Sequence, residues 1–332
     1  MIERLRVEGF RMLRQVDVPL RPLTVLVGAN NSGKTSFLRS LEFLVGGWTW
    51  QAHFAWRQSS RVAVTLSASI SGRGVVNECV AEPGGGGASR SGSWSLLQPE
   101  LEPRIYVELP RHGPPMAGNA VPDVQGAPPL DGQGNGVPAL LDHLQRRDRP
   151  RYDRYVTAAR ERIPGLVDVT LTATSSNMRA LALRIEGGLD LDAEQASAGV
   201  RVMLFFLSLA YHPRPPRLIM VEEPETGLHP RRLKDVVGLL RSLTTGEHGG
   251  EPAQVILTTH SPYLLDHVDL ARDQVLVFRR GGEGEALVEA ADPQRLNAFL
   301  DEFMLGEVWF NQGEEGLVAP VADVVRPAPA GE

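Results

Sequence analysis

Residues 28–35 constrain this chain most strongly. They read Gly-Ala-Asn-Asn-Ser-Gly-Lys-Thr and match the pattern G-x-x-x-x-G-K-[ST]. Residues 23–27 before them are apolar or β-branched, which predicts a buried strand. Residues 36–44 after them carry apolar side chains at helical spacing. A strand, a glycine-rich loop and a helix in this order predict a phosphate-binding loop within an α/β fold.

The loop predicts a nucleoside triphosphate with Mg²⁺ as its ligand. Backbone N–H groups of such a loop surround phosphate oxygens, while Lys34 reaches the β- and γ-phosphates and the Thr35 hydroxyl binds the metal. Of the 34 basic residues in the chain, only Lys34 and Lys234 are lysines. Position 34 therefore keeps the slim charge that fits inside the loop, which a planar guanidinium does not. The expected nucleotide-binding residues here are Gly28, Ala29, Asn30, Asn31, Ser32, Gly33, Lys34, Thr35 and Ser36.

Two further apolar segments end in polar side chains. Residues 217–221 precede Glu222 and Glu223, and residues 256–258 precede Thr259, His260 and Ser261. Strand ends of this kind bind ligands in α/β sheets. Adjacent side chains on a strand point apart, so one carboxylate is expected to hold the Mg²⁺ shell and the other to polarise the attacking water. His260 is expected to sense the γ-phosphate. The alternatives are an acidic helix N-terminus and a structural histidine.

A third segment, Ser197-Ala198-Gly199, precedes an apolar helix over residues 198–211. Ser197 and Gly199 are expected to present a hydroxyl and backbone N–H groups to a γ-phosphate bound by a second subunit. The alternative is that Ser197 only caps the helix.

In this order the motifs resemble the ATP-binding-cassette (ABC) type ATPase heads of the RecF, SMC and OLD (overcoming lysogenisation defect) group. Residues 5–11 look like the first strand and the corner of that group. Residues 222–230, Glu-Glu-Pro-Glu-Thr-Gly-Leu-His-Pro, are close to the OLD-like pattern E-E-P-E-x-x-L-H-P. Residues 131–141 and 305–309 look like segments of stand-alone bacterial members. The resemblance reaches residue 312.

The resemblance implies a role for each matching residue. Lys34 and Thr35 bind phosphate and Mg²⁺, Glu222 completes the metal site and Glu223 is the catalytic glutamate. His260 is the switch histidine, Ser197 and Gly199 act on the partner's nucleotide, and Arg11 contacts nucleotide. The Ser197 segment departs from the group because it lacks the usual leucine before the serine. The glutamine that senses Mg²⁺ is either Gln51 or Gln58.

The expected fold is an α/β P-loop NTPase of ABC-ATPase-like form, with a mixed central sheet, an N-terminal antiparallel β subdomain and a small helical insertion. A single head is expected over residues 1–312. Its parts are an N-terminal lobe (1–110), an irregular connection with the insertion (111–163) and a C-terminal lobe (164–312). Residues 313–332 are expected to be disordered. Residues 139–162 carry many arginines, which indicates either a nucleic-acid or partner contact or a solvated helical face.

Composition limits the function classes. A net charge of −6 at pH 7 argues against nucleic-acid binding by bulk electrostatics. The single cysteine, Cys79, and the absence of an 18-residue apolar stretch favour a cytoplasmic protein with no membrane span. About 20 residues follow Trp309, too few for the Toprim nuclease of OLD proteins.

The resemblance implies three alternative functions, in each of which ATP is the ligand. The first is an ATP-dependent homodimeric switch for a separate effector, such as a nuclease in DNA repair or phage defence. The second is a RecF-like clamp that itself binds DNA, and the third is a transporter's nucleotide-binding subunit. The OLD-like pattern around Glu222 disfavours the third.

Overall fold

The computed structural model of the chain describes residues 1–46, 55–57, 59, 61–70, 73–83, 88–92, 104–119, 126–175, 178–291, 293–300 and 302–318. It divides into two compact units, of which one takes residues 1–102 and 256–332 and the other takes residues 103–255. This division differs from the predicted lobes. The chain from Ile256 onward packs in the same unit as the N-terminal part, because β14 pairs directly with β3.

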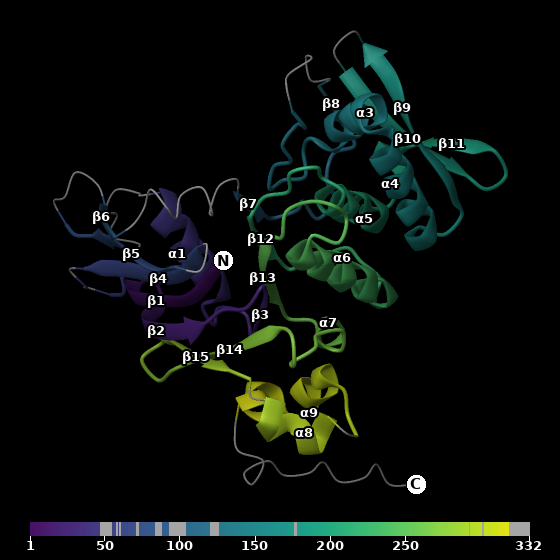
Figure 1. The fold of residues 1–332 in the computed structure, drawn as a ribbon. Helices are drawn as coiled ribbons and strands as arrows, with labels where there is room; N and C mark the ends of the chain where they lie inside the picture. Colours follow the sequence, from purple (N-terminus) through teal and green to yellow (C-terminus); the bar gives the residue numbers. More distant parts are fainter. Residues whose placement is uncertain are drawn as a thin grey trace, which may run out of the picture. The chain divides into compact units, whose positions relative to one another are not determined.

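An antiparallel sheet forms one layer of the first unit (Figure 1). Its order is β2-β1-β4-β5-β6, and every pairing is antiparallel. Alternation explains β1, in which Leu5 and Val7 are fully buried while Arg4 and Arg6 are exposed. The predicted N-terminal antiparallel subdomain is confirmed. The strands are β1 (Ile2–Phe10), β2 (Leu13–Pro19), β4 (Val62–Ile70), β5 (Arg73–Ala81) and β6 (Ser89–Gly92).

The predicted phosphate loop lies in the second layer of the same unit. It joins β3 (Leu23–Val27), whose five side chains are all buried, to α1 (Lys34–Gly46). β14 (Gln274–Arg280) pairs with β3 in parallel and with β15 (Ala286–Ala290) antiparallel, and β13 (Gln254–Thr259) follows β3 in the strand order. The Phe37 ring of α1 meets the Phe278 ring of β14 edge-on, with 5.6 Å between centroids.

The described C-terminal part of the first unit contains the helices α7 (Pro262–Leu265), α8 (Pro293–Leu300) and α9 (Leu305–Val318). The chain is helical to Val318, with a kink at Gly313, where a disordered tail was expected to begin. Leu317 and Val318 are buried, so apolar packing extends this helix past the glycine. Residues 319–332 lie outside the described residues.

The second unit contains the parallel pair β7 (Arg104–Val107) and β12 (Leu218–Glu222). Helices α5 (Ala198–Ala210) and α6 (Leu233–Thr245) belong to it, and every α5 side chain from Arg201 to Ala210 is buried. A second, antiparallel sheet is formed by β8 (Ala117–Asn119), β9 (Leu166–Ser175), β10 (Met178–Ile185) and β11 (Leu189–Asp192). Parallel and antiparallel pairs alternating with helices confirm the predicted α/β class with a mixed sheet.

The arginine-rich insertion is a helix pair, α3 (Val137–Arg147) and α4 (Arg149–Arg162), packed on the β9–β10 sheet (Figure 1). Arginines on the pair bind carboxylates, as in Arg149 with Asp153 at 2.8 Å. Tyr152 is buried and donates to the Val169 carbonyl at 2.6 Å, and Tyr155 is fully buried as well. Both rings belong to the core instead of a stacking surface, which favours the interpretation as a solvated helical face.

His212, beyond the end of α5, predicts a pH-dependent stability for the second unit. Its Nε2–H donates to the Pro128 carbonyl at 2.9 Å, and its Nδ1 accepts from the Arg214 backbone N–H at 3.0 Å. Burial lowers the pKa of His212, so the ring is neutral when folded and gains a proton on unfolding in acid. The free energy of unfolding should fall by up to about 1.4 kcal/mol per pH unit below about pH 6.5.

Thermal unfolding of the unaltered chain and of His212→Gln between about pH 7.5 and 5.5 tests this expectation. Gln keeps an N–H donor for Pro128 but does not titrate, so its unfolding midpoint should decline less steeply. Equal slopes for the two proteins would contradict the assignment.

Candidate nucleotide-binding and catalytic site

Two positions of the 28–35 loop accept only glycine, because any side chain there would clash with a neighbouring strand. Gly28 has φ +147°, and a Cβ there would lie 2.2 Å from the Phe278 carbonyl oxygen. Gly33 has φ +109°, and its Cβ would lie 2.8 Å from the Cβ of Ala286. The loop is therefore pressed against the β14–β15 hairpin, with a backbone conformation and a close approach that require glycine.

Lys34 points back into the loop. Its Nζ donates to the carbonyl oxygens of Gly28 at 2.6 Å and Ala29 at 2.8 Å, and the residue is only 6% exposed. The loop thus holds a buried positive charge at its centre, whereas Thr35 at the start of α1 is exposed. A lysine inside such a loop and an accessible hydroxyl at the helix start are the two groups that would bind the phosphates and the metal ion of a nucleoside triphosphate.

The buried hydroxyl of Ser32 indicates whether the loop can accept a phosphate group. Ser32 Oγ is buried and has no hydrogen-bond partner within the part of the chain that the structure describes. A buried polar group without a partner costs about 1–3 kcal/mol, and a phosphate oxygen would supply the missing acceptor. The loop residues therefore fit a bound phosphate, with Lys34 and Thr35 as the residues that would hold ATP·Mg²⁺.

Two other predicted residues belong to the same unit as the loop. His260 follows the last residue of β13, and the next N–H, of Ser261, donates to Thr259 Oγ1 at 3.0 Å. Arg11 lies in the β1–β2 turn at φ +50°, with its guanidinium carbon 5.6 Å from the centroid of the Phe10 ring. Their roles toward a nucleotide stay predictions. Gln51 and Gln58 lie outside the described residues.

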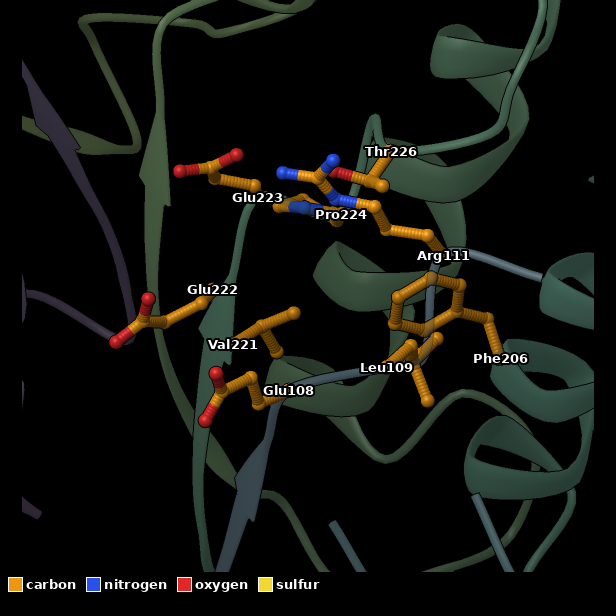
Figure 2. Close-up of a pocket in the computed structure, with 9 residues that line it drawn as sticks. All are labelled: Glu108, Leu109, Arg111, Phe206, Val221, Glu222, Glu223, Pro224 and Thr226. Carbon is orange, nitrogen blue, oxygen red and sulfur yellow. The ribbon is translucent and has the colours of Figure 1, made fainter. Parts of the chain in front are cut away.

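The two carboxylates end β12 in the second unit. Glu222 is the last strand residue, and its Oε1 accepts a hydrogen bond from the Tyr106 hydroxyl of β7. Glu223 has φ +45°, a strained conformation for a residue that is not glycine. The two carboxylates extend toward the same side of β12 in Figure 2, whereas Val221 extends to the other side. The expectation that they point apart was wrong, because the positive φ of Glu223 ends the strand alternation.

A cavity of about 200 Å³ adjoins these carboxylates within the second unit. Leu109, Val221 and Phe206 form an apolar wall, and the Arg111 guanidinium lies near Thr226 (Figure 2). No motif of the sequence connects residues 108–111 with the carboxylates. The cavity is lined by Glu108, Leu109, Arg111, Phe206, Val221, Glu222, Glu223, Pro224 and Thr226.

The start of α5 packs against the loop that follows Glu223. Ser197 caps α5, its Oγ accepting from the Val200 N–H at 3.4 Å, as the alternative interpretation expected, and the residue is exposed. A Cβ on Gly199 would lie 2.9 Å from the Gly227 carbonyl oxygen. The structure thus brings Ser197 and Gly199 together with the Glu223 loop inside one unit.

Comparison with known proteins finds matches to ATPase families and to an OLD nuclease. Residues 1–62 match the family "AAA ATPase domain", and residues 134–266 match the family "AAA domain, putative AbiEii toxin, Type IV TA system". A 46-residue segment is 48% identical to the OLD nuclease of Thermus scotoductus. That segment is 14% of this chain and spans 9% of the relative.

Solved SMC heads share the fold. An SMC head bound to the C-winged helix domain of ScpA has a TM-score of 0.63 at 16% identity, over 90% of this chain and 99% of that chain. The SMC head domain from Thermotoga maritima has a TM-score of 0.53 at 13% identity, over 88% and 99%. The chain therefore has the fold of an ABC-type ATPase head. In the part of the chain that the structure describes, no helix is both long enough and apolar enough to cross a bilayer.

Several contacts near the candidate site could not be predicted from the sequence. Arg201 of α5 pairs with Glu194 at 2.8 Å, and the other Glu194 carboxylate oxygen accepts from the Ala117 N–H at 3.0 Å. This pair fixes the segment that contains Ser197. A basic residue seven positions after a carboxylate at a helix start was a weak signal for it.

Proposed function

We propose that this chain is an ABC-type ATPase head that binds ATP·Mg²⁺ and hydrolyses the ATP. Lys34 would bind the β- and γ-phosphates, Thr35 and Glu222 the Mg²⁺ shell, and Glu223 would polarise the attacking water. When bound, the metal supplies charge that neutralises the developing negative charge on the phosphates. The observation that carries the proposal is the loop interior, where Lys34 is buried and the Ser32 hydroxyl has no acceptor among the described residues.

We further propose that two heads pair around two nucleotides, with Ser197 and Gly199 of each facing the ATP of the other. The exposure of Ser197 and the helix N-terminus that it caps support this role, because N–H groups at a helix start bind phosphate. ATP would bind the closed pair better than separate heads and so shift the population toward it. A symmetric pairing gives two equal sites.

The paired state would regulate a separate effector, such as a nuclease in DNA repair or phage defence. The segment shared with an OLD nuclease supports a nuclease partner. A RecF-like clamp is the second candidate, since SMC heads share its fold group. The ion pairs of the arginine-rich helices favour the effector, because charges used internally are less available to DNA.

Light scattering on the Glu223→Gln protein tests the pairing. With ATP and Mg²⁺ this slow variant should form a dimer, or tighten an existing one. Adding Ser197→Arg should prevent dimerisation, because a bulky cation would occupy the partner's phosphate site. If the molar mass of Glu223→Gln is the same with and without ATP, or if the double variant dimerises normally, the proposed head-to-head pairing is wrong. Ser208→Ala, at a buried site on the same helix, is the matched control.

A further inference from the structure

Tyr106 and Glu222 share one face of the β7–β12 pair. The strands are parallel, with Tyr106 opposite Met220 and Val107 opposite Val221. Paired residues point to the same face, and so do residues two apart along a strand. Tyr106 therefore lies diagonally beside Glu222. Glu108 lies beside Glu222, one residue beyond the last pair of the two strands, Val107 and Val221. Figure 2 agrees, because Glu108 and Glu222 extend to one side and Val221 to the other.

The Tyr106 hydroxyl donates a hydrogen bond to Glu222 Oε1. We propose that Tyr106 is a positioning residue for the metal site, which holds the Glu222 carboxylate in the orientation that completes the Mg²⁺ shell. The inference deepens the proposed function and rests on it. It concerns a tyrosine that no motif of the sequence includes.

The surroundings explain why Glu222 needs such a partner. The terminal torsion of a glutamate side chain is broad, so a carboxylate at a strand end does not fix its own plane. A second carboxylate, Glu108, lies on the same face and would repel it. A neutral hydroxyl on a rigid ring with two side-chain torsions holds one oxygen without cancelling the charge, and it leaves Oε2 for the metal shell. Such outer partners change metal affinity or activity by about 10–100-fold.

Tyr106→Phe removes this hydrogen bond and keeps the ring that packs in the strand pair. We expect its affinity for the non-hydrolysable analogue AMP-PNP in EDTA to equal that of the unaltered chain. The gain in affinity on adding excess Mg²⁺ should be about tenfold smaller. Isothermal calorimetry measures both affinities without any turnover.

Tyr152→Phe is the matched control. It also removes a tyrosine hydroxyl that donates to an oxygen in the second unit, the Val169 carbonyl, but away from the carboxylates. It should lower the melting temperature while leaving the Mg²⁺ gain intact. A double-mutant cycle excludes a folding effect: in the Glu222→Gln background, Tyr106→Phe should change the Mg²⁺ gain no further.

The outcomes are separable. If the unaltered chain binds no AMP-PNP in either buffer, the proposed function fails, and this inference fails with it. If the unaltered chain gains affinity with Mg²⁺ and Tyr106→Phe gains as much, only the inference is overturned. A reduced gain that persists in the Glu222→Gln background also overturns it, because Tyr106 would then act through another group.

Discussion

Replacing Glu223 by glutamine is expected to reduce ATP hydrolysis about a hundredfold or more while leaving ATP binding nearly unchanged. Glutamine has the size of glutamate and some of its hydrogen bonding, but it cannot take a proton from the attacking water. The ATP-bound state should therefore accumulate. Release of phosphate under steady-state conditions measures the loss, and calorimetry with ATP measures the retained binding.

Glu222→Gln is the matched comparison for this prediction. It changes the neighbouring carboxylate in the same way, and it should weaken the Mg²⁺ dependence of binding instead of trapping ATP. The roles would be reversed if Glu222→Gln gave the trapped state and Glu223→Gln hydrolysed ATP at the normal rate.

Replacing Lys34 by alanine is expected to abolish measurable ATP binding while the fold remains intact. The charge-assisted contacts to phosphate are worth on the order of 2–3 kcal/mol, or about a hundredfold in affinity. Lys34→Arg should fail as well, because the guanidinium does not fit where Nζ lies 2.6 Å from the Gly28 carbonyl oxygen. Calorimetry with ATP and circular dichroism separate loss of binding from loss of structure.

The chain offers an unusually clean control. Lys234, its other lysine, is exposed on α6, so Lys234→Ala removes the same charge from a residue outside the loop and should bind ATP normally. ATP affinity that is equal for Lys34→Ala and the unaltered chain would refute the phosphate-binding role of the loop.

The local parts of the site could be predicted from the sequence. The strand, loop and helix around Lys34 are fixed by neighbouring residues, as are the apolar strand before Glu222 and the cap at Ser197. Each depends on backbone preferences and apolar patterns within about ten residues. These elements lie where they were expected.

The contacts that complete the site could not be predicted, because they join distant segments. Tyr106 meets Glu222 only through the β7–β12 pairing, 116 residues away along the chain. Position 28 must be glycine because β14 brings the Phe278 carbonyl to the place where a side chain would lie. The positive φ of Glu223 has no pattern signal either, since glutamate is rare in that conformation. Alternation along the strand therefore gave the wrong direction for its side chain.

The close approach between Gly199 and the Gly227 carbonyl has a consequence for timing. With 2.9 Å left for even a methyl carbon, the start of α5 and the loop behind Glu223 have no slack between them. In the proposed dimer the start of α5 would contact the partner's ATP. The loop behind Glu223 would respond to the ATP that its own subunit binds. A displacement of one of these two segments would therefore displace the other. The hydrolysis events at the two sites would then be coupled instead of independent. A looser contact between the start of α5 and the Glu223 loop would let the two sites hydrolyse ATP independently.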